Sequence, residues 1–387
     1  MKTTFDTIVL GLGGIGSGAL YHLARRGVSV LGIEQFELGH TRGASQDHSR
    51  IIRLSYHTPA YVELAREAYT AWTNLETAAG EALILRTGGL DLFPPNGAIP
   101  MDDYTGSMRA ADVEFDTLSA RDVMQRWPQF NLKPDVIALF QKESGIAPAV
   151  KCSAAHLRMA RAHGAAVIKN APVSGLRSSG PDIEVEAGGA RYTCRSLVIT
   201  AGAWTNDVLA HFGRRLPLEV TQEQVTYYAS PNPGDYAPGR FPIWIWMDEP
   251  CFYGFPVYGE AGPKVAQDVG GRVVTAETRT FEPNPDTTRR TEDFLREVLP
   301  GIPGPQIYTK TCLYTLTPDR DFILDRLPGH PNVFVTVGAG HAFKFASVLG
   351  RILSDLVIDG RSESDINAFR FDRSILQTEN PPRSYMI

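Results

Sequence analysis

The chain of 387 residues is longer than a single hydrophobic core usually supports, so we expect two domains or one domain with a large insertion. Its composition, 43% apolar and 21% charged, is that of a globular protein and argues against extended disorder. The 38 basic and 43 acidic side chains give a formal charge of -5, so there is no electrostatic reason to expect nucleic acid or an acidic membrane surface as a partner.

The cysteines and the N-terminus predict the cell compartment. The four cysteines, Cys152, Cys194, Cys251 and Cys312, are far apart, and no C-x-x-C pair indicates zinc or a redox dithiol. We therefore expect free thiols in a reducing compartment and no metal site. Because the N-terminus lacks the pattern of a secretion signal and no stretch is long enough to span a membrane, we expect a soluble cytoplasmic protein.

The first residues predict a strand, a tight turn and a helix. Residues 5–11 are a short β-branched run that ends in glycine, and apolar residues at helical spacing follow as far as Gly27. Residues 28–33 predict a second buried strand, which ends at Glu34. These elements form the opening of a βαβ unit.

The turn carries the pattern G-x-G-x-x-G at Gly11, Gly13 and Gly16. A Cβ there would keep the backbone away from a pyrophosphate at the helix N-terminus, and Glu34 can accept hydrogen bonds from ribose hydroxyls. The pattern predicts dinucleotide binding, the alternative being a tight turn without a ligand. FAD and NAD share this pattern, and an acid at Glu34 argues only against a 2′-phosphate.

Later segments predict that the chain returns to this domain. Residues 59–79 predict a helix with one apolar face. Helical periodicity around residues 153–165 precedes a strand at 197–200, and a strand at 333–337 leads into a further helix.

Residues 83–144 and 216–309, which lie between the segments of this domain, are rich in turns and strands, and the second range has alternating aromatic residues. We therefore expect an α/β fold, in which a doubly wound, Rossmann-like nucleotide-binding domain carries an inserted antiparallel-sheet substrate domain, with the active site between them. The predicted ranges are 1–82, 145–215 and 310–387 for the nucleotide-binding domain, and 83–144 and 216–309 for the substrate domain.

Four further segments carry a resemblance. They are Gly43-Ala44-Ser45 through Ser49-Arg50-Ile51-Ile52-Arg53, the strand and turn 197–204, Lys310-Thr311-Cys312-Leu313-Tyr314-Thr315-Leu316-Thr317-Pro318-Asp319, and Gly340-His341-Ala342-Phe343-Lys344. Together with the glycine loop they resemble the monomeric sarcosine oxidase and N-methyltryptophan oxidase family of flavoproteins. The likeness covers nearly the whole chain, and its specific parts are the cysteine segment and the lysine loop.

The resemblance implies that the cofactor is FAD, joined by a thioether from Cys312 to the 8α-methyl of the flavin. Taken alone, a single cysteine beside Leu313 is more often a buried apolar residue. A covalent bond would retain the flavin and make it a better oxidant. The cofactor contacts that we expect are Gly11, Gly13, Gly14, Ile15, Gly16, Glu34, Gln35, Ser45, Arg50, Ala201, Gly202, Trp204, Cys312, Gly338, Gly340 and Lys344.

Three basic residues match functional positions of the family. Arg53 and Lys344 match the pair that binds the substrate carboxylate, where a bidentate guanidinium and a point charge would orient the amino acid. Lys264 matches the lysine that lies over the flavin and promotes its reaction with oxygen. The alternative is that Arg53 and Lys344 are surface residues and that Lys264 lies in a solvated turn.

Other residues match positions that line the flavin or the substrate, namely Arg50, Tyr56, Tyr253, Tyr314 and His341. We expect Tyr253 and Tyr314 to enclose the amine substituent, although aromatic residues in a strand-rich domain are more often core. His341 is either a flavin contact or a loop histidine whose hydrogen bonds are already satisfied.

One residue departs from the family pattern. Sarcosine oxidase has a histidine near the substrate, four residues after the lysine, and this chain has Asp268 there. A carboxylate would favour a substrate with an additional positive charge or a persistent iminium, so sarcosine itself is not carried over. Alternatively, Asp268 points to solvent.

The function that follows is oxidation of a small secondary amino acid, N-methyl or cyclic, by hydride transfer from the neutral amine to flavin N5. The product is an imine, and molecular oxygen is reduced to hydrogen peroxide. The resemblance also implies a monomer. The alternatives are an imino-acid desaturase, an amine dehydrogenase with an acceptor other than oxygen, and a non-enzymatic dinucleotide-binding assembly protein.

Overall fold

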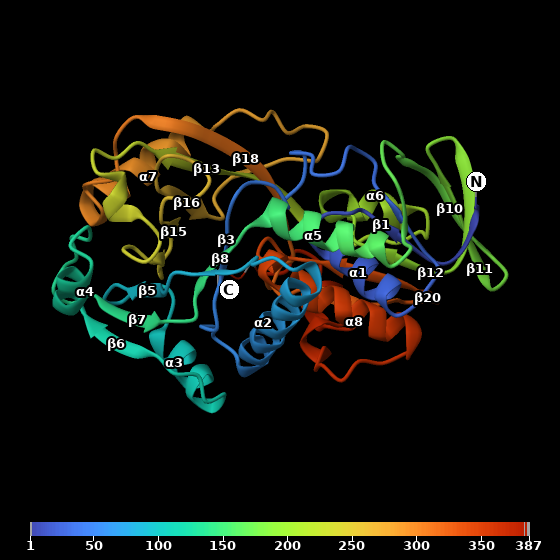
Figure 1. Cartoon of the computed structure of the whole chain (residues 1–387), viewed down its shortest axis with the longest axis horizontal. Helices are drawn as coiled ribbons and strands as arrows, with labels where there is room; N and C mark the ends of the chain where they lie inside the picture. Colours follow the sequence, from blue (N-terminus) through green and yellow to red (C-terminus); the bar gives the residue numbers. More distant parts are fainter. Residues whose placement is uncertain (1, 383, 385–387) are drawn as a thin grey trace.

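The computed structural model describes residues 2–382 and 384. The chain forms an eight-stranded sheet, which contains β1 and β12, and a nine-stranded sheet, which contains β5 and β15. In Figure 1 the first sheet lies on the right beside helices α1 and α8, and the second lies on the left. A three-stranded sheet consists of β3 (Arg50–Ile52), β8 (Gly145–Ala147) and β4 (Leu85–Arg86). Within the described part of the chain, no helix is long and apolar enough to cross a membrane.

The eight-stranded sheet contains the nucleotide-binding strands. β1 pairs in parallel with β2 and β12, β2 with β9, and β12 with β20, whereas β10, β11 and β19 pair antiparallel. The four strands predicted for this domain are confirmed, at β1, at β2, at the end of β12 and at β20. The bounds are β1 (Thr4–Leu10), β2 (Val30–Ile33), β9 (Ala166–Ile168), β10 (Val173–Ser179), β11 (Asp182–Ala187), β12 (Ala190–Ile199), β19 (Ile323–Leu327) and β20 (His330–Val337).

Helix α1 (Gly14–Arg25) follows the glycine loop and packs against α5 (Ala149–Ala162) and α8 (Ala346–Ile358). A Cβ on Gly350 would lie 2.3 Å from the Gly18 carbonyl carbon, so glycine permits the close approach of α1 and α8. Helix α5 is shifted from the predicted range 153–165, because it begins directly after Pro148 and ends before Gly164, whose φ is +88°.

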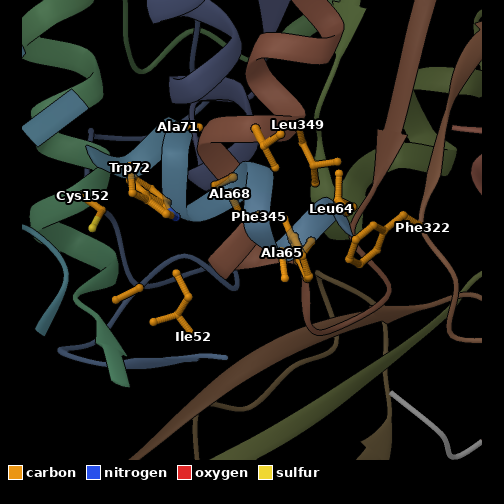
Figure 2. Packing of buried hydrophobic residues seen from close by; sticks show 14 of the residues in the cluster. Ile52, Leu64, Ala65, Ala68, Ala71, Trp72, Cys152, Phe322, Phe345 and Leu349 are labelled. Atoms are coloured by element: carbon orange, nitrogen blue, oxygen red, sulfur yellow. The ribbon is translucent and has the colours of Figure 1, made fainter. Parts of the chain in front are cut away.

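Helix α2 (Pro59–Ala79) has the predicted bounds and the predicted buried face. Thr58 caps its first turn and Gly80, in the left-handed conformation, ends it. The indole Nε1 of Trp72 donates a hydrogen bond to the carbonyl oxygen of Lys344 at 2.7 Å, so this core also fixes the lysine loop. Figure 2 shows the packing of α2 with α8 and its neighbours through Leu64, Ala65, Ala68, Trp72, Phe322, Phe345 and Leu349.

The nine-stranded sheet is mostly antiparallel, as predicted, with one parallel pair between β14 and β5. Its strands are β5 (Gly89–Phe93), β6 (Asp116–Ser119), β7 (Ile137–Gln141), β13 (Glu219–Tyr228), β14 (Ile243–Trp246), β15 (Cys251–Phe255), β16 (Lys264–Asp268), β17 (Arg272–Val273) and β18 (Gln306–Leu316). The remaining α-helices are α3 (Met101–Ala110), α4 (Ala120–Arg126), α6 (Thr205–Ala210), α7 (Pro285–Val298) and α9 (Ser374–Gln377).

Two features of the second sheet differ from the prediction. Helix α7 lies inside residues 216–309, where we expected strands. It was not predicted because its buried stripe includes the polar residues Thr287 and Thr291, which hide the apolar periodicity of the helix. Strand β18, which carries Cys312, pairs with β13 along its length, although we assigned residues 310–387 to the nucleotide-binding domain. The predicted domain boundaries stay predictions.

Candidate active site

A cavity of about 790 Å³ extends from the glycine loop to the nine-stranded sheet. Its size is within the range of small-molecule sites. The sequence-predicted residues in its lining are Gly11, Gly13, Gly14, Ile15, Glu34, Gln35, Ser45, Arg50, Ala201, Gly202, Trp204, Tyr253, Asp268, Tyr314, Gly338, Gly340, His341 and Lys344. Five others, Gly16, Arg53, Tyr56, Lys264 and Cys312, are not in the lining.

The glycine loop presents backbone to the cavity. Gly11 has φ +85°, and a Cβ on Gly16 would lie 1.8 Å from the Gly11 carbonyl oxygen, so Gly16 is needed for the tight turn itself. The N–H of Gly14 donates to Ser45 Oγ at 2.8 Å, and no side chain of the N-cap residue Gly13 caps α1. The first turn of α1 therefore offers N–H groups and the positive end of the helix dipole, which fits a pyrophosphate.

Glu34 is a buried acceptor at the end of β2. Its carboxylate accepts hydrogen bonds from the N–H groups of Leu12 at 2.9 Å and Phe36 at 3.1 Å, and it lies 3.4 Å from His40 Nε2. Burial opposes ionisation, but these contacts with His40 and the backbone hold the pKa of Glu34 below its usual value. An ionised carboxylate in the cavity lining fits ribose hydroxyls, so the loop and Glu34 together fit the adenosine end of FAD.

Arg53 is buried, with 1% of its surface exposed, so the alternative of a surface arginine is wrong. Its Nη1 lies 3.1 Å from Asp91 Oδ1 on β5, and Ser55 Oγ donates to the same carboxylate. Although burial alone would lower it, the Asp91 charge raises the pKa of Arg53 above its usual value. Sequence reasoning missed Asp91, although a charged residue inside the apolar run Gly-Leu-Asp-Leu-Phe is a signal of a buried pair.

Lys344 is also buried and is not the surface residue of the alternative. Its Nζ lies 5.6 Å from the centre of the Tyr56 ring, and the side chain forms no hydrogen bond or ion pair with another described residue. Burial, Arg53 and Arg320 lower the pKa of Lys344 to about 7. Lys344 is therefore a cation in the cavity lining that is available to an anionic ligand.

Lys264 has 1% of its surface exposed, which excludes a solvated turn. Its Nζ donates to Asp47 Oδ2 at 3.0 Å and to the Ser49 carbonyl at 2.8 Å, and it lies 4.1 Å from the centre of the Phe255 ring. Burial lowers the pKa of Lys264 to about 8 in spite of Asp47. Sequence reasoning missed Asp47, which has φ +75° and lies in the segment that carries the resemblance.

Asp268 is buried at the end of β16 and lines the cavity, so the alternative that it points to solvent is wrong. It accepts a hydrogen bond from Arg320 Nη2 at 3.3 Å. The carbonyl of Arg320 lies 2.8 Å from His341 Nε2, while burial, Lys344 and Arg320 hold the pKa of His341 well below its usual value. Arg320 was not predicted, although it directly follows Asp319, the last residue of the cysteine segment.

Cys312 lies in β18 opposite Glu223 of β13 and is buried. Burial raises the pKa of its thiol to about 11, against the opposing effect of Arg50. Its neighbours Leu313 and Tyr314 line the cavity, although Cys312 does not. All four cysteines are free, as predicted.

The predicted tyrosines form part of the site. Tyr253 and Tyr314 are half-buried in the cavity lining and are therefore not confined to the core. Tyr56 lies behind the lining, with its ring centre 5.0 Å from the Arg53 guanidinium. Tyr253, Tyr314 and the buried Lys344 thus line the same cavity as the glycine loop.

Comparison with known proteins agrees with this arrangement. The chain is 35% identical to monomeric sarcosine oxidase of Streptomyces avermitilis, over 95% of this chain and 97% of the relative. It is 31% identical to N-methyl-L-tryptophan oxidase of Escherichia coli, over 95% and 99%. Its fold matches NikD, described as an unusual amino acid oxidase essential for nikkomycin biosynthesis, with a TM-score of 0.85 and 24% identity over 100% and 99% of the two chains.

A family model described as FAD dependent oxidoreductase matches residues 6–356. The predicted resemblance and the Rossmann-like α/β fold class are confirmed. The chain belongs to the FAD dependent oxidoreductase family.

Proposed function

We propose that this protein is an oxidase that uses FAD to oxidise the C–N bond of a small secondary amino acid, N-methyl or cyclic, with molecular oxygen as the final acceptor. The observation that carries the proposal is one cavity whose lining includes both the dinucleotide loop and Lys344, Tyr253 and Tyr314. Two relatives are named for the oxidation of sarcosine and N-methyl-L-tryptophan, both N-methyl amino acids.

FAD, when bound, supplies an acceptor for hydride from the substrate and passes the electrons to oxygen, with hydrogen peroxide as the product. The glycine loop and Glu34 would hold its adenosine and pyrophosphate. Cys312 would hold the flavin as a thioether at the 8α-methyl. Its position in β18 next to Leu313 and Tyr314, which line the cavity, supports this role.

The carboxylate of the substrate would bind to Lys344, with Arg53 close behind it. Because Asp91 balances the charge of Arg53, Lys344 supplies the net positive charge for a single carboxylate. A fixed carboxylate would orient the carbon that loses hydride, which contributes to catalysis by positioning.

The amine must be neutral for its lone pair to assist the loss of hydride. The buried ammonium of Lys344 favours this form, because nearby positive charge lowers the pKa of an ammonium group. Tyr253 and Tyr314 would enclose the substituent on nitrogen and exclude water from it.

Lys264 would promote the reaction with oxygen. Two of its N–H groups are used by Asp47 and the Ser49 carbonyl, and a lysine has three donors, so one remains for a reduced oxygen species. The fixed ammonium would stabilise developing negative charge without reorganisation. We also propose that the protein acts as a monomer in the cytoplasm.

The test is a panel of N-methyl and cyclic amino acids, scored for peroxide in air and for flavin bleaching without oxygen. We expect at least one compound to give both signals. Bleaching without peroxide would replace the oxidase with a dehydrogenase, and a protein that retains no flavin and oxidises no amine would contradict the proposal as a whole.

A further inference from the structure

Asp268 and Arg320 form a buried ion pair beside the cavity. Asp268, with 8% of its surface exposed, lies in the lining, whereas Arg320, with 3% exposed, lies behind it. Arg320 Nη2 and Asp268 Oδ2 are 3.3 Å apart. The carboxylate therefore faces the cavity with a fixed cation behind it.

Arg320 is itself held by the surrounding backbone. It has φ +63°, an uncommon conformation for a residue with a side chain, which persists where the surrounding structure imposes it. Its Nε donates to the Ala339 carbonyl at 3.2 Å, and its own carbonyl accepts from His341 Nε2 at 2.8 Å. Arg320 thus connects β16 to the loop that leads to Lys344, and it is a positioning residue.

The pair changes the charge expected of the substrate. Asp268 alone would favour an additional positive charge on the ligand, but Arg320 balances it. Asp91 likewise balances Arg53, and Lys344 is left as the uncompensated cation of this group. A single carboxylate matches that net charge, so a second cationic group on the substrate is not required.

One oxygen of Asp268 is available to a ligand. Arg320 engages Oδ2, while Oδ1 has no hydrogen-bond donor among the described residues. A carboxylate can only accept, so its complement on an amino acid is an N–H. A neutral secondary amine has one N–H and one lone pair, and the lone pair is needed to expel hydride.

We propose that Asp268 Oδ1 accepts the N–H of the substrate amine, and that this contact selects primary and secondary amino acids over fully N-alkylated ones. This inference rests on the proposed function. It assigns Arg320 the task of holding the carboxylate in place, since the hydrogen bond from its Nε to the Ala339 carbonyl orients the guanidinium.

His341 is the competing acceptor in the same wall. Its Nε2 donates to the Arg320 carbonyl, so the neutral ring leaves Nδ1 as an acceptor. Nδ1 is buried and has no protein partner in the described chain. The charged oxygen of Asp268 is the stronger acceptor, because hydrogen bonds to ionised groups exceed those between neutral groups.

The experiment compares pyrrole-2-carboxylate and furan-2-carboxylate, two ligands of the same shape in which N–H replaces oxygen. Each is titrated into the flavin-loaded protein and followed by flavin absorbance. We expect pyrrole-2-carboxylate to bind about tenfold or more tightly, in line with a hydrogen bond to a charged group. The Asp268→Ala variant should bring the ratio of the two Kd values near one, while both ligands still bind.

Further variants keep the test informative. Asp268→Ala leaves Arg320 buried without its partner, so the double variant Asp268→Ala, Arg320→Met removes both charges and should give the same ratio near one. The Arg320→Lys variant should prefer pyrrole-2-carboxylate over furan-2-carboxylate more strongly than Arg320→Met does, because lysine keeps the positive charge beside Asp268. Asp355→Ala, which removes a carboxylate paired with Arg26 and Arg351 away from the cavity lining, should leave the ratio unchanged.

Equal Kd values of the two ligands in the unmodified protein would overturn the inference. A preference for pyrrole-2-carboxylate that remains in the Asp268→Ala variant would also overturn it and would assign the contact to His341. These results differ from failure of the proposed function. In that case neither ligand would perturb the flavin and no amino acid would bleach it. With function intact, N-methylated substrates should reduce the flavin about tenfold or more faster than their N,N-dimethyl counterparts, and equal rates would also overturn the inference.

Discussion

The ammonium of Lys264 donates a hydrogen bond to Asp47 Oδ2 at 3.0 Å inside the protein, where both side chains are almost completely buried. Burial opposes ionisation of the carboxyl group, but Lys264 and Arg50 lower the pKa of Asp47 to about 2. Because the pKa of Lys264 is about 8, the lysine carries its charge at neutral pH and below. The pair therefore keeps a fixed cation next to the predicted flavin site.

Replacement of this cation should affect one half-reaction more than the other. We expect Lys264→Met to slow reoxidation of the flavin by oxygen about 100-fold or more, with a much smaller effect on reduction by the substrate. Stopped-flow absorbance measures the two half-reactions separately. Equal slowing of both would contradict the role of Lys264 in oxygen reduction.

The same substitution leaves the buried Asp47 carboxylate with only the Tyr227 hydroxyl and, at 3.9 Å, Arg50 as partners, and loss of the lysine should lower the free energy of unfolding by up to about 3–5 kcal/mol. The double variant Lys264→Met, Asp47→Asn is the control, since it removes both charges. It should recover most of the stability in chemical denaturation but not the oxygen reactivity. If the double variant recovered the rate of flavin reoxidation by oxygen, the effect of Lys264→Met on that rate would be due to loss of stability and not to loss of the ammonium.

Binding of a carboxylate ligand should weaken as the pH rises above about 7. Burial and the neighbouring arginines lower the pKa of Lys344 to about 7, so its ammonium is present below that pH and is lost above it. We expect the Kd of furan-2-carboxylate to rise up to about tenfold per pH unit above 7, until only the contribution of Arg53 remains. The Lys344→Gln variant should bind more weakly at low pH and show a flat profile, and a flat profile in the unmodified protein would refute the assignment.

Gly16→Ala should abolish retention of FAD. Its Cβ would lie 1.8 Å from the Gly11 carbonyl oxygen, so the turn that carries the loop cannot form without displacement. Gly106→Ala is a matched control in an exposed part of α3, where a Cβ meets nothing within 4 Å. It should raise the unfolding free energy by about 0.5–1 kcal/mol and keep the flavin. Normal flavin content in Gly16→Ala would contradict the geometry of the loop.

Cys312→Ser should release the flavin when the protein is precipitated with acid. In the unmodified protein we expect the yellow colour to stay in the precipitate and the intact mass to include one FAD. Cys194→Ala, another buried free thiol, should behave like the unmodified protein. Colour that leaves the precipitate in every case would show that the flavin is not covalently bound.

Much of the fold could be predicted because local pattern and tertiary structure agree. Helix α2 was predicted from its apolar face, and in the structure a threonine cap, a proline in the first turn and a left-handed glycine mark its ends. Helix α7 was not, because threonines in its buried stripe weaken the apolar period. The pairing of strand β18 with β13 was not predicted, because the two strands are distant in the chain and pairing over that distance has no local signal.

The predicted cations are buried near the candidate site, but their partners were missed. Asp47, Asp91 and Arg320 lie on elements that meet Lys264, Arg53 and Asp268 only after folding. Two of these partners, Asp47 and Arg320, have positive φ, which no residue preference of Asp or Arg predicts with certainty. The sequence therefore predicted which charged residues belong to the site, and the structure showed which opposite charges balance them.

The central claim is that a flavin in this cavity accepts hydride from a small secondary amino acid held by Lys344. The most direct measurement is an anaerobic titration of the purified yellow protein with N-methyl and cyclic amino acids, each paired with its analogue that lacks nitrogen. We predict that a secondary amino acid bleaches the flavin absorbance and its nitrogen-free analogue does not, and that Lys344→Gln raises the concentration needed. A flavin that no amino acid reduces would contradict the claim.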